Sequence, residues 1–159
     1  TDIPVHYWYE EVGGEPAAPT VERTYHPGDD YDITSPRIPG YEVDIKKVTG
    51  TAGDEDEVYD LIYTPIDYHL TIRYIDMNGN PVAEPYQDVL NAHDLYSVTV
   101  PTVEGMTPSR SRVKGEMPAR DVVITVIYVS PQDGYTFIPD YEPAMCAGEI
   151  SLNICECYE

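Results

Sequence analysis

The sequence predicts a mainly β protein, α+β at most, in which two tandem modules are followed by a C-terminal extended strand. An internal repeat divides most of the chain into two similar halves. Within each half, apolar and polar residues alternate in short runs bounded by Gly, Pro and Asn, a pattern typical of β-strands and turns. The aromatic content agrees, because 15 Tyr stand against one Phe, and Tyr favours half-buried strand surfaces where its hydroxyl reaches water.

The repeat appears when the sequence is shifted by 65 positions, which aligns residues 5–63 with residues 70–128 without a gap. The identical positions are mostly turn glycines, turn prolines and strand residues, which a repeated fold needs. They include Gly14/Gly79, Pro36/Pro101 and Tyr63/Tyr128. The predicted organisation is a first module (1–63), a linker (64–69), a second module (70–128) and a tail (129–159).

Each module is expected to begin with a strand and a hairpin turn. In the second module, residues 70–75 (LTIRYI) alternate apolar with polar side chains, and Asn78-Gly79 then favours a tight hairpin. The first module has Gly13-Gly14 at the same place.

Two further strands are expected in each module. Residues 31–36 and 96–101 are short strands that end at a proline, and residues 57–63 and 121–128 are closing apolar strands. The second closing run is apolar on both faces, as is typical of a central strand.

A helix has room only in the stretch between the hairpin and these strands, at residues 18–30 and 83–95. Pro19 and Pro27 interrupt the first copy, so we expect one or two helical turns at most.

The net charge excludes several partners. With 29 acidic and 9 basic residues the chain carries −20, which repels nucleic acid and anionic lipid. No apolar window reaches the roughly 18 to 20 residues of a membrane span, so no membrane insertion is expected. The sequence has neither a signal-peptide pattern nor an initiator Met, which suggests a mature or trimmed segment of a secreted protein.

Two stretches of the second module resemble a known family. Residues 71–86 (TIRYIDMNGNPVAEPY) and 98–129 (VTVPTVEGMTPSRSRVKGEMPARDVVITVIYV) are similar to the mucin-binding-protein (MucBP) repeats of Gram-positive surface proteins. The first module departs from the pattern, with EEVGGE at residues 10–15 and TAGDEDE at residues 51–57 in place of EMPARDV. The tail resembles, more weakly, the acidic tails of clostridial repeat-bearing exported proteins.

The resemblance implies two tandem ubiquitin-like, β-grasp modules in an extracellular, non-enzymatic protein at the surface of a Gram-positive bacterium. Such repeats either bind mucin or other glycans or serve as plain spacers, and the resemblance leaves both open.

Neither catalysis nor a cofactor is predicted. The four histidines have no metal-ligand spacing and adjoin no candidate nucleophile, and no serine lies in a Gly-x-Ser-x-Gly elbow. The acidic run at residues 53–57 has ligands suited to calcium, but a solvated turn is the favoured interpretation, so no metal site is predicted.

Trp8 is the first candidate contact residue. If Val5, Tyr7 and Tyr9 face inward, Trp8 faces outward together with His6, and its counterpart in the second module is Arg73. An outward Trp on a strand is typical of a protein contact, which we rank first, or of a sugar-stacking platform. Coverage of that face by the tail is the other interpretation.

Two charged patches are further candidates for contact between chains. Acidic residues gather in the first module at Asp54, Glu55, Asp56 and Glu57, and basic residues gather in the second at Arg110, Arg112 and Lys114. Opposite patches on different modules favour head-to-tail contact between copies, although a simple solvated surface explains them equally well.

The tail combines an alternating strand with three cysteines. Ile150, Leu152 and Ile154 alternate with polar residues, which predicts an extended strand suited to pairing with another sheet edge. Cys155 and Cys157 lie about 6.5 to 7 Å apart on one face of such a strand, too far apart for an easy bridge. Cys146 can pair with one of them, which leaves the other for a neighbouring chain.

The sequence therefore predicts an adhesive or structural surface protein that polymerises or is anchored through its tail. The alternative is a monomeric module that binds mucin or glycans. A tail that covers its own module and leaves one thiol free also remains open.

Overall fold

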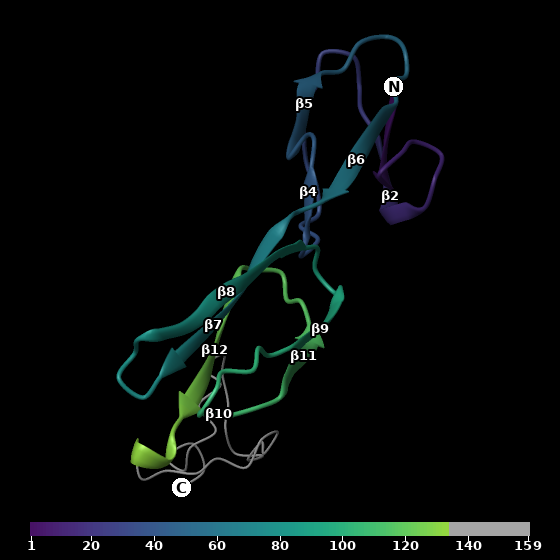
Figure 1. Cartoon of the computed structure of the whole chain (residues 1–159). Helices are drawn as coiled ribbons and strands as arrows, with labels where there is room; N and C mark the ends of the chain where they lie inside the picture. Colours follow the sequence, from purple (N-terminus) through teal and green to yellow (C-terminus); the bar gives the residue numbers. More distant parts are fainter. Residues whose placement is uncertain (134–159) are drawn as a thin grey trace, which may run out of the picture. The chain divides into compact units, whose positions relative to one another are not determined.

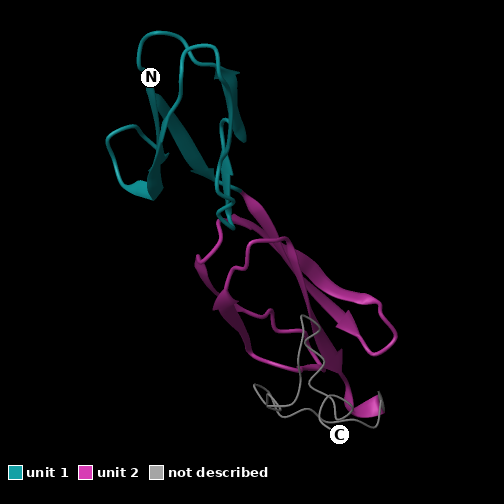
Figure 2. Cartoon of the chain, turned by 180° about the vertical axis from the view of Figure 1, so that it is seen from behind, with its two compact units in different colours: residues 1–66 teal, residues 67–159 magenta. Residues whose placement is uncertain are grey.

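The computed structural model describes residues 1–133, and their regular secondary structure is almost entirely β-strand (Figure 1). The chain divides into two compact units, the first from Thr1 to Ile66 and the second beginning at Asp67 (Figure 2). The prediction of a mainly β protein built from two sheet-based modules is confirmed. We call the two units the first and second module.

The first module contains a four-stranded sheet and a separate two-stranded one. Its strands are β1 (Asp2–Tyr9), β2 (Pro16–Thr24), β3 (Asp30–Thr34), β4 (Tyr41–Val43), β5 (Lys47–Thr51) and β6 (Tyr59–Pro65). The larger sheet has the order β2-β1-β6-β4, and β3 pairs with β5. The central strands β1 and β6 are parallel, whereas the other pairs are antiparallel.

The second module repeats this arrangement. Its strands are β7 (Tyr68–Asp76), β8 (Pro81–Leu90), β9 (Leu95–Thr99), β10 (Thr107–Pro108), β11 (Arg112–Glu116) and β12 (Val122–Val129). The larger sheet has the order β10-β12-β7-β8, and β11 pairs with β9. β12 lies between two neighbours, so the prediction of a central strand is confirmed. The β7–β8 hairpin turns at Gly79, whose φ of 86° suits glycine.

The one or two helical turns allowed at most for residues 18–30 and 83–95 are absent. Residues 18–24 and 83–90 belong to the edge strands β2 and β8, and within residues 1–133 the helical element is the 3₁₀ turn η1 (Pro131–Asp133). Pro19 and Pro85 disfavour a helix interior but are tolerated in an edge strand, which need not donate every N–H. No helix in this part of the chain has the length and hydrophobicity to cross a membrane.

The connection between the modules is shorter than the predicted linker. β6 continues through Pro65 and β7 already begins at Tyr68, so Ile66 and Asp67 alone lie between the two strands.

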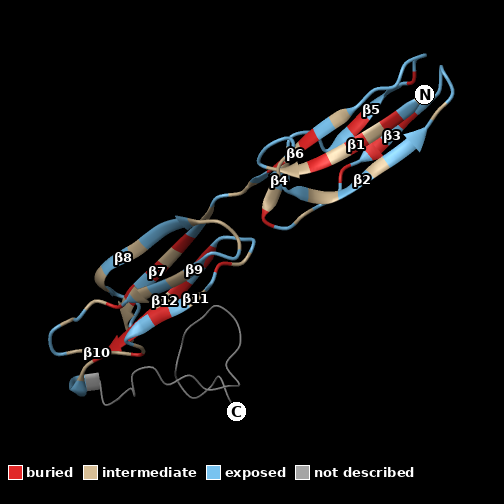
Figure 3. Ribbon diagram, turned by 90° about the vertical axis from the view of Figure 1, so that its right-hand side faces the viewer, coloured by how far each residue is buried: buried red, intermediate tan, exposed pale blue. Residues whose placement is uncertain are grey.

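The core of each module lies between its two sheets (Figure 3). In the first module, residues of β1 and β6 such as Val5 and Leu61 pack in one cluster with Ile33 of β3 and Val48 of β5. The second module has an equivalent cluster from β7, β12 and β11. The alternation expected in β1 is confirmed, because Tyr7 is buried with Val5.

Buried tyrosines close both cores in the same way. Tyr63 donates its hydroxyl hydrogen to the carbonyl of Pro36, and Tyr128 donates to the carbonyl of Pro101. Burial raises the pKa of each of these two phenols to about 12. The 65-residue repeat therefore preserves a hydrogen bond as well as a strand order.

Candidate ligand-binding site

Trp8 lies on the outer face of the first module's sheet. Its neighbour Tyr7 points into the core, and alternate side chains of a strand point to opposite faces. The indole is half-buried rather than covered. β1 is flanked by β2 on one side and β6 on the other, so Trp8 stands within the sheet rather than at its edge.

Side chains from neighbouring strands hold the indole in place. The Nε1–H of Trp8 donates to Oδ1 of Asp60 at 2.8 Å. The ring of His6 lies 6.1 Å from the indole, centroid to centroid, tilted by 36°. His6 in turn contacts Thr20 of β2, with 2.9 Å between Nδ1 and Oγ1. We call His6, Trp8, Thr20 and Asp60 the Trp8 face.

The Trp8 face combines an aromatic plate with polar groups at its margin. The apolar face of a sugar ring packs on an aromatic side chain, while carboxylate and hydroxyl groups bind the sugar hydroxyls. An indole already fixed by Asp60 loses little rotamer freedom when a ligand binds. The arrangement therefore has the chemistry of a candidate binding surface for a sugar.

The second module lacks this arrangement although it shares the fold. Thr71, Arg73, Pro85 and Thr125 stand at the positions of His6, Trp8, Thr20 and Asp60. Because neither an aromatic ring nor a carboxylate is kept there, the fold does not require them. The Trp8 face is therefore a specialisation of the first module.

The acidic run from Asp54 to Glu57 is exposed, but half of it accepts hydrogen bonds within the module. Asp56 accepts the backbone N–H of Asp2 at 2.7 Å, and Glu57 accepts the hydroxyl of Tyr31 at 3.0 Å. These two carboxylates brace the loop between β5 and β6, and Asp54 and Glu55 remain as candidates for contact. Within residues 1–133, no cluster of three His, Cys, Asp or Glu side chains could hold a metal ion.

The basic patch lies on the second module. Arg112 and Lys114 are exposed and two residues apart on β11, so they share a face, whereas Arg110 precedes the strand and is half-buried. Arg112 donates from Nη1 to Oγ of Ser97 at 2.9 Å. The patch is thus real as a surface feature, and its role in contact between copies stays a prediction.

Cys146, Cys155 and Cys157 lie outside the described residues, and so does the predicted strand with Ile150, Leu152 and Ile154.

Sequence reasoning placed Trp8 and His6 on the outer face of their strand but assigned no role to Asp60 or Thr20. Asp60 reaches Trp8 because β1 and β6 pair in parallel, with His6 opposite Asp60 in the register. Such a pairing between strands more than fifty residues apart leaves no local signal in the sequence. All four residues of the Trp8 face are replaced by other residues in the second module, and this shared difference is the signal that could have linked them.

Comparison with known proteins gives one family. The model of the MucBP domain matches residues 2–64 and again residues 69–144. No curated protein matches the chain significantly.

Several solved structures are similar to the chain. The type 2 repeat of the mucus binding protein MUB from Lactobacillus reuteri is 18% identical, with a TM-score of 0.34, over 81% of this chain and 98% of that one. The MucBP domain of the adhesion protein from Pediococcus pentosaceus is 20% identical, with a TM-score of 0.33, over 41% of this chain and 98% of that one. The Bacillus anthracis TIE protein is 13% identical, with a TM-score of 0.51, over 81% of this chain and 33% of that one, a likeness of fold.

Proposed function

This chain belongs to the MucBP domain family, and on that premise we propose that it is a non-enzymatic adhesion protein that binds mucin-type glycans through the Trp8 face. The family match supports an adhesive module at the surface of a Gram-positive bacterium. It covers both modules, so the tandem arrangement belongs to the proposal as well.

One observation carries the choice of the Trp8 face. Trp8 is held by Asp60 on an outer sheet face, half-exposed, and the second module has Arg73 at the same position. A large aromatic residue that the fold does not need is most simply retained for a ligand. The sheet face also offers His6 and Thr20 for hydrogen bonds.

Binding of the full chain to immobilised mucin tests the proposal. Replacing Trp8 by Ala removes the stacking surface, and we expect affinity to fall about tenfold, the factor that corresponds to about 1.4 kcal/mol. Leu95→Ala is the matched control, because Leu95 is a large, exposed apolar residue of the second module. Equal binding by wild type, Trp8→Ala and Leu95→Ala would refute the role of the Trp8 face.

Self-assembly through the tail is a second candidate, favoured by the odd number of cysteines. With three cysteines, at least one thiol has no partner within the chain. In this proposal Cys146, Cys155 or Cys157 links neighbouring copies, and the strand with Ile150, Leu152 and Ile154 pairs with a neighbouring sheet.

Electrophoresis of unreduced protein tests the assembly. We expect a ladder of multimers that collapses on reduction and is lost when the chain is truncated after Gly148. A single band at monomer mass under oxidising conditions would exclude the covalent link. This test is independent of Trp8, so either function can fail alone.

A further inference from the structure

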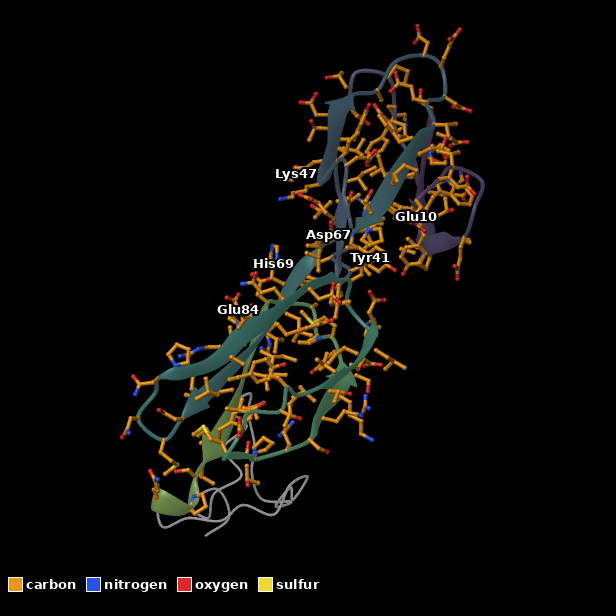
Figure 4. All side chains as sticks on the ribbon, viewed as in Figure 1. Glu10, Tyr41, Lys47, Asp67, His69 and Glu84 are labelled. Atoms are coloured by element: carbon orange, nitrogen blue, oxygen red, sulfur yellow. The ribbon has the colours of Figure 1, made fainter. Side chains whose placement is uncertain are left out.

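The first module contains a cleft whose chemistry differs from that of the Trp8 face. The cleft has a volume of about 580 Å³ and lies beside β4 and β6. Its lining includes the charged residues Arg37, Glu42 and Lys46 and the aromatic ring of Tyr41, which is labelled in Figure 4. It thus brings two cations together with one flat apolar surface.

The cleft is separate from the Trp8 face. Tyr63, which also lines the cleft, is opposite Tyr9 in the β1–β6 register and is buried in the core. Trp8 precedes Tyr9, so its side chain points to the other side of the sheet. A ligand in the cleft therefore need not contact Trp8.

Hydrogen bonds and ring packing hold the walls of the cleft. Ser35 donates its backbone N–H to the carbonyl of Lys46 at 2.9 Å, and its hydroxyl donates to the carbonyl of Ile45 at 2.7 Å. The ring of Tyr41 packs on Tyr9 with 4.8 Å between centroids. A site that is formed before the ligand arrives loses less entropy on binding.

Within residues 1–133, the two cations of the cleft have no carboxylate at ion-pair distance. Residues 5–63 contain 14 acidic and 4 basic side chains, so carboxylates are plentiful. Lys47 forms an ion pair with Asp32 at 3.3 Å. Arg37 and Lys46 form no ion pair with any carboxylate in the described part of the chain, and both are exposed. Their charges are therefore available to an external anion.

The internal repeat shows that the fold does not require these charges. Thr102, Met106 and Ser111 occupy the positions of Arg37, Tyr41 and Lys46 in the second module. The surrounding framework is nevertheless kept, including the hydrogen bond from the closing tyrosine to the proline carbonyl. The cationic and aromatic residues thus distinguish the first cleft from its counterpart.

We propose that this cleft binds an acidic saccharide, a sugar that carries a sulfate or a carboxylate. The guanidinium of Arg37 presents paired N–H donors that match two oxygens of either anion, and Lys46 adds a second positive charge. Tyr41 supplies a surface for the sugar ring, and Glu42 accepts hydrogen bonds from its hydroxyls. The inference deepens the proposed glycan-binding function by naming a charge-bearing ligand class and a second site for it.

Calorimetry on the full chain with three probes tests this proposal. The probes are N-acetyllactosamine, its sulfated form and a form capped with glucuronic acid. We expect wild type to bind one or both acidic probes about tenfold more tightly than the neutral one, as a charge-assisted bidentate contact provides. Preference for the sulfated or for the capped probe identifies the anion.

The double variant Arg37→Thr/Lys46→Ser carries the residues of the second module and should lose this preference. The control Arg23→Thr/Lys47→Ser removes the same two charges from outside the cleft and should keep it. Circular dichroism checks that both variants fold. Equal affinity of wild type for acidic and neutral probes, or a preference retained by Arg37→Thr/Lys46→Ser, would overturn the proposal.

Trp8→Ala should leave the preference for the acidic probe intact, so failure of the Trp8 face is distinguishable from failure of the cleft.

Discussion

Gly50 lies beneath the phenol of Tyr31, and this contact makes Gly50→Ala a demanding test of the packing. Tyr31 and Gly50 are directly opposite in the β3–β5 pair. A Cβ at Gly50 would lie 2.5 Å from the Tyr31 hydroxyl oxygen and 2.8 Å from its Cζ, which is too close for either atom. The ring must therefore move or the strands must separate.

Tyr31 cannot move freely, because its hydroxyl and its ring are both engaged. The hydroxyl lies 2.7 Å from the hydroxyl of Tyr59 and donates to Glu57 at 3.0 Å. The ring packs on Tyr25 at 5.6 Å between centroids. Overpacking costs about 1 to 3 kcal/mol, and each hydrogen bond lost adds about 1 kcal/mol. Ala recovers about 0.5 to 1 kcal/mol over Gly in a strand, so we expect a net loss of about 2 kcal/mol.

Gly115→Ala in the second module is the matched comparison. Its Cβ would lie 2.7 Å from the Tyr96 hydroxyl oxygen. Tyr96 is half-buried, and in the described residues its hydroxyl makes no hydrogen bond, so the ring can shift at a smaller cost. We expect a loss of about 1 kcal/mol or less, because only the overpacking part remains.

The unfolding of the first module can be measured separately, because Trp8 is the single tryptophan of the chain. Urea unfolding followed by its fluorescence reports the first module, and circular dichroism reports both. With an m-value of about 1 kcal/mol/M, Gly50→Ala should lower the fluorescence midpoint by about 2 M, and Gly115→Ala should leave it unchanged. An unchanged or raised fluorescence midpoint for Gly50→Ala would refute the packing argument.

Three further predictions concern pH, backbone strain and salt. Burial raises the pKa of Tyr63 to about 12. The stability that the buried, neutral phenol contributes is therefore complete below pH 10 and is lost as the pH rises toward 12. In fluorescence-monitored unfolding, wild type should lose more stability than Tyr63→Phe between pH 9 and pH 11. His93 has a φ of 75°, a left-handed backbone conformation that strains a residue with a Cβ, and the first module has Gly28 at this position. His93→Gly should therefore stabilise the second module by about 0.5 to 1 kcal/mol in circular dichroism melts. A lower melting midpoint for His93→Gly would contradict the argument that His93 is strained. The chain carries −20, so the association rate with an acidic mucin should increase from 20 to 150 mM salt, because screening weakens the repulsion; a rate that falls with salt would contradict this.

The strands in which buried and exposed side chains alternate strictly were predictable from the sequence, and the edge strands were not. β1 and β7 bury every second side chain, so their pattern in the sequence is clear. β2 and β8 lie at sheet edges, have mostly exposed side chains, and contain register shifts against β1 and β7. An edge strand with irregular pairing has no strict alternation, and residues 18–24 and 83–90 were therefore interpreted as room for a helix.

The candidate sites show the same division between local and long-range information. The outward direction of Trp8 follows from the alternation around Tyr7, which the sequence contains. Its partner Asp60 follows from a parallel pairing across the module, which the sequence does not contain. The cleft at Arg37 and Lys46 required knowledge of which cations already have carboxylate partners, and only side-chain positions supply that.

The repeat nevertheless contained more than the strand order. Asp56 and Asp121 are 65 residues apart, and each accepts a backbone N–H from the first strand of its own module, from Asp2 and His69 respectively. Asp56, in the acidic run at residues 53–57, thus has a structural role, and comparison of the two copies could have indicated it.

The indole N–H of Trp8 gives the most direct test that the Trp8 face is the glycan-binding surface. Because the chain has one tryptophan, a ¹⁵N correlation spectrum of the full protein contains one indole cross-peak, which belongs to the group that donates to Asp60. Titration with a mucin-type O-glycan should shift this peak together with the backbone peaks of His6, Thr20 and Asp60. An indole peak that stays in place while the glycan binds elsewhere, or does not bind at all, would contradict the account.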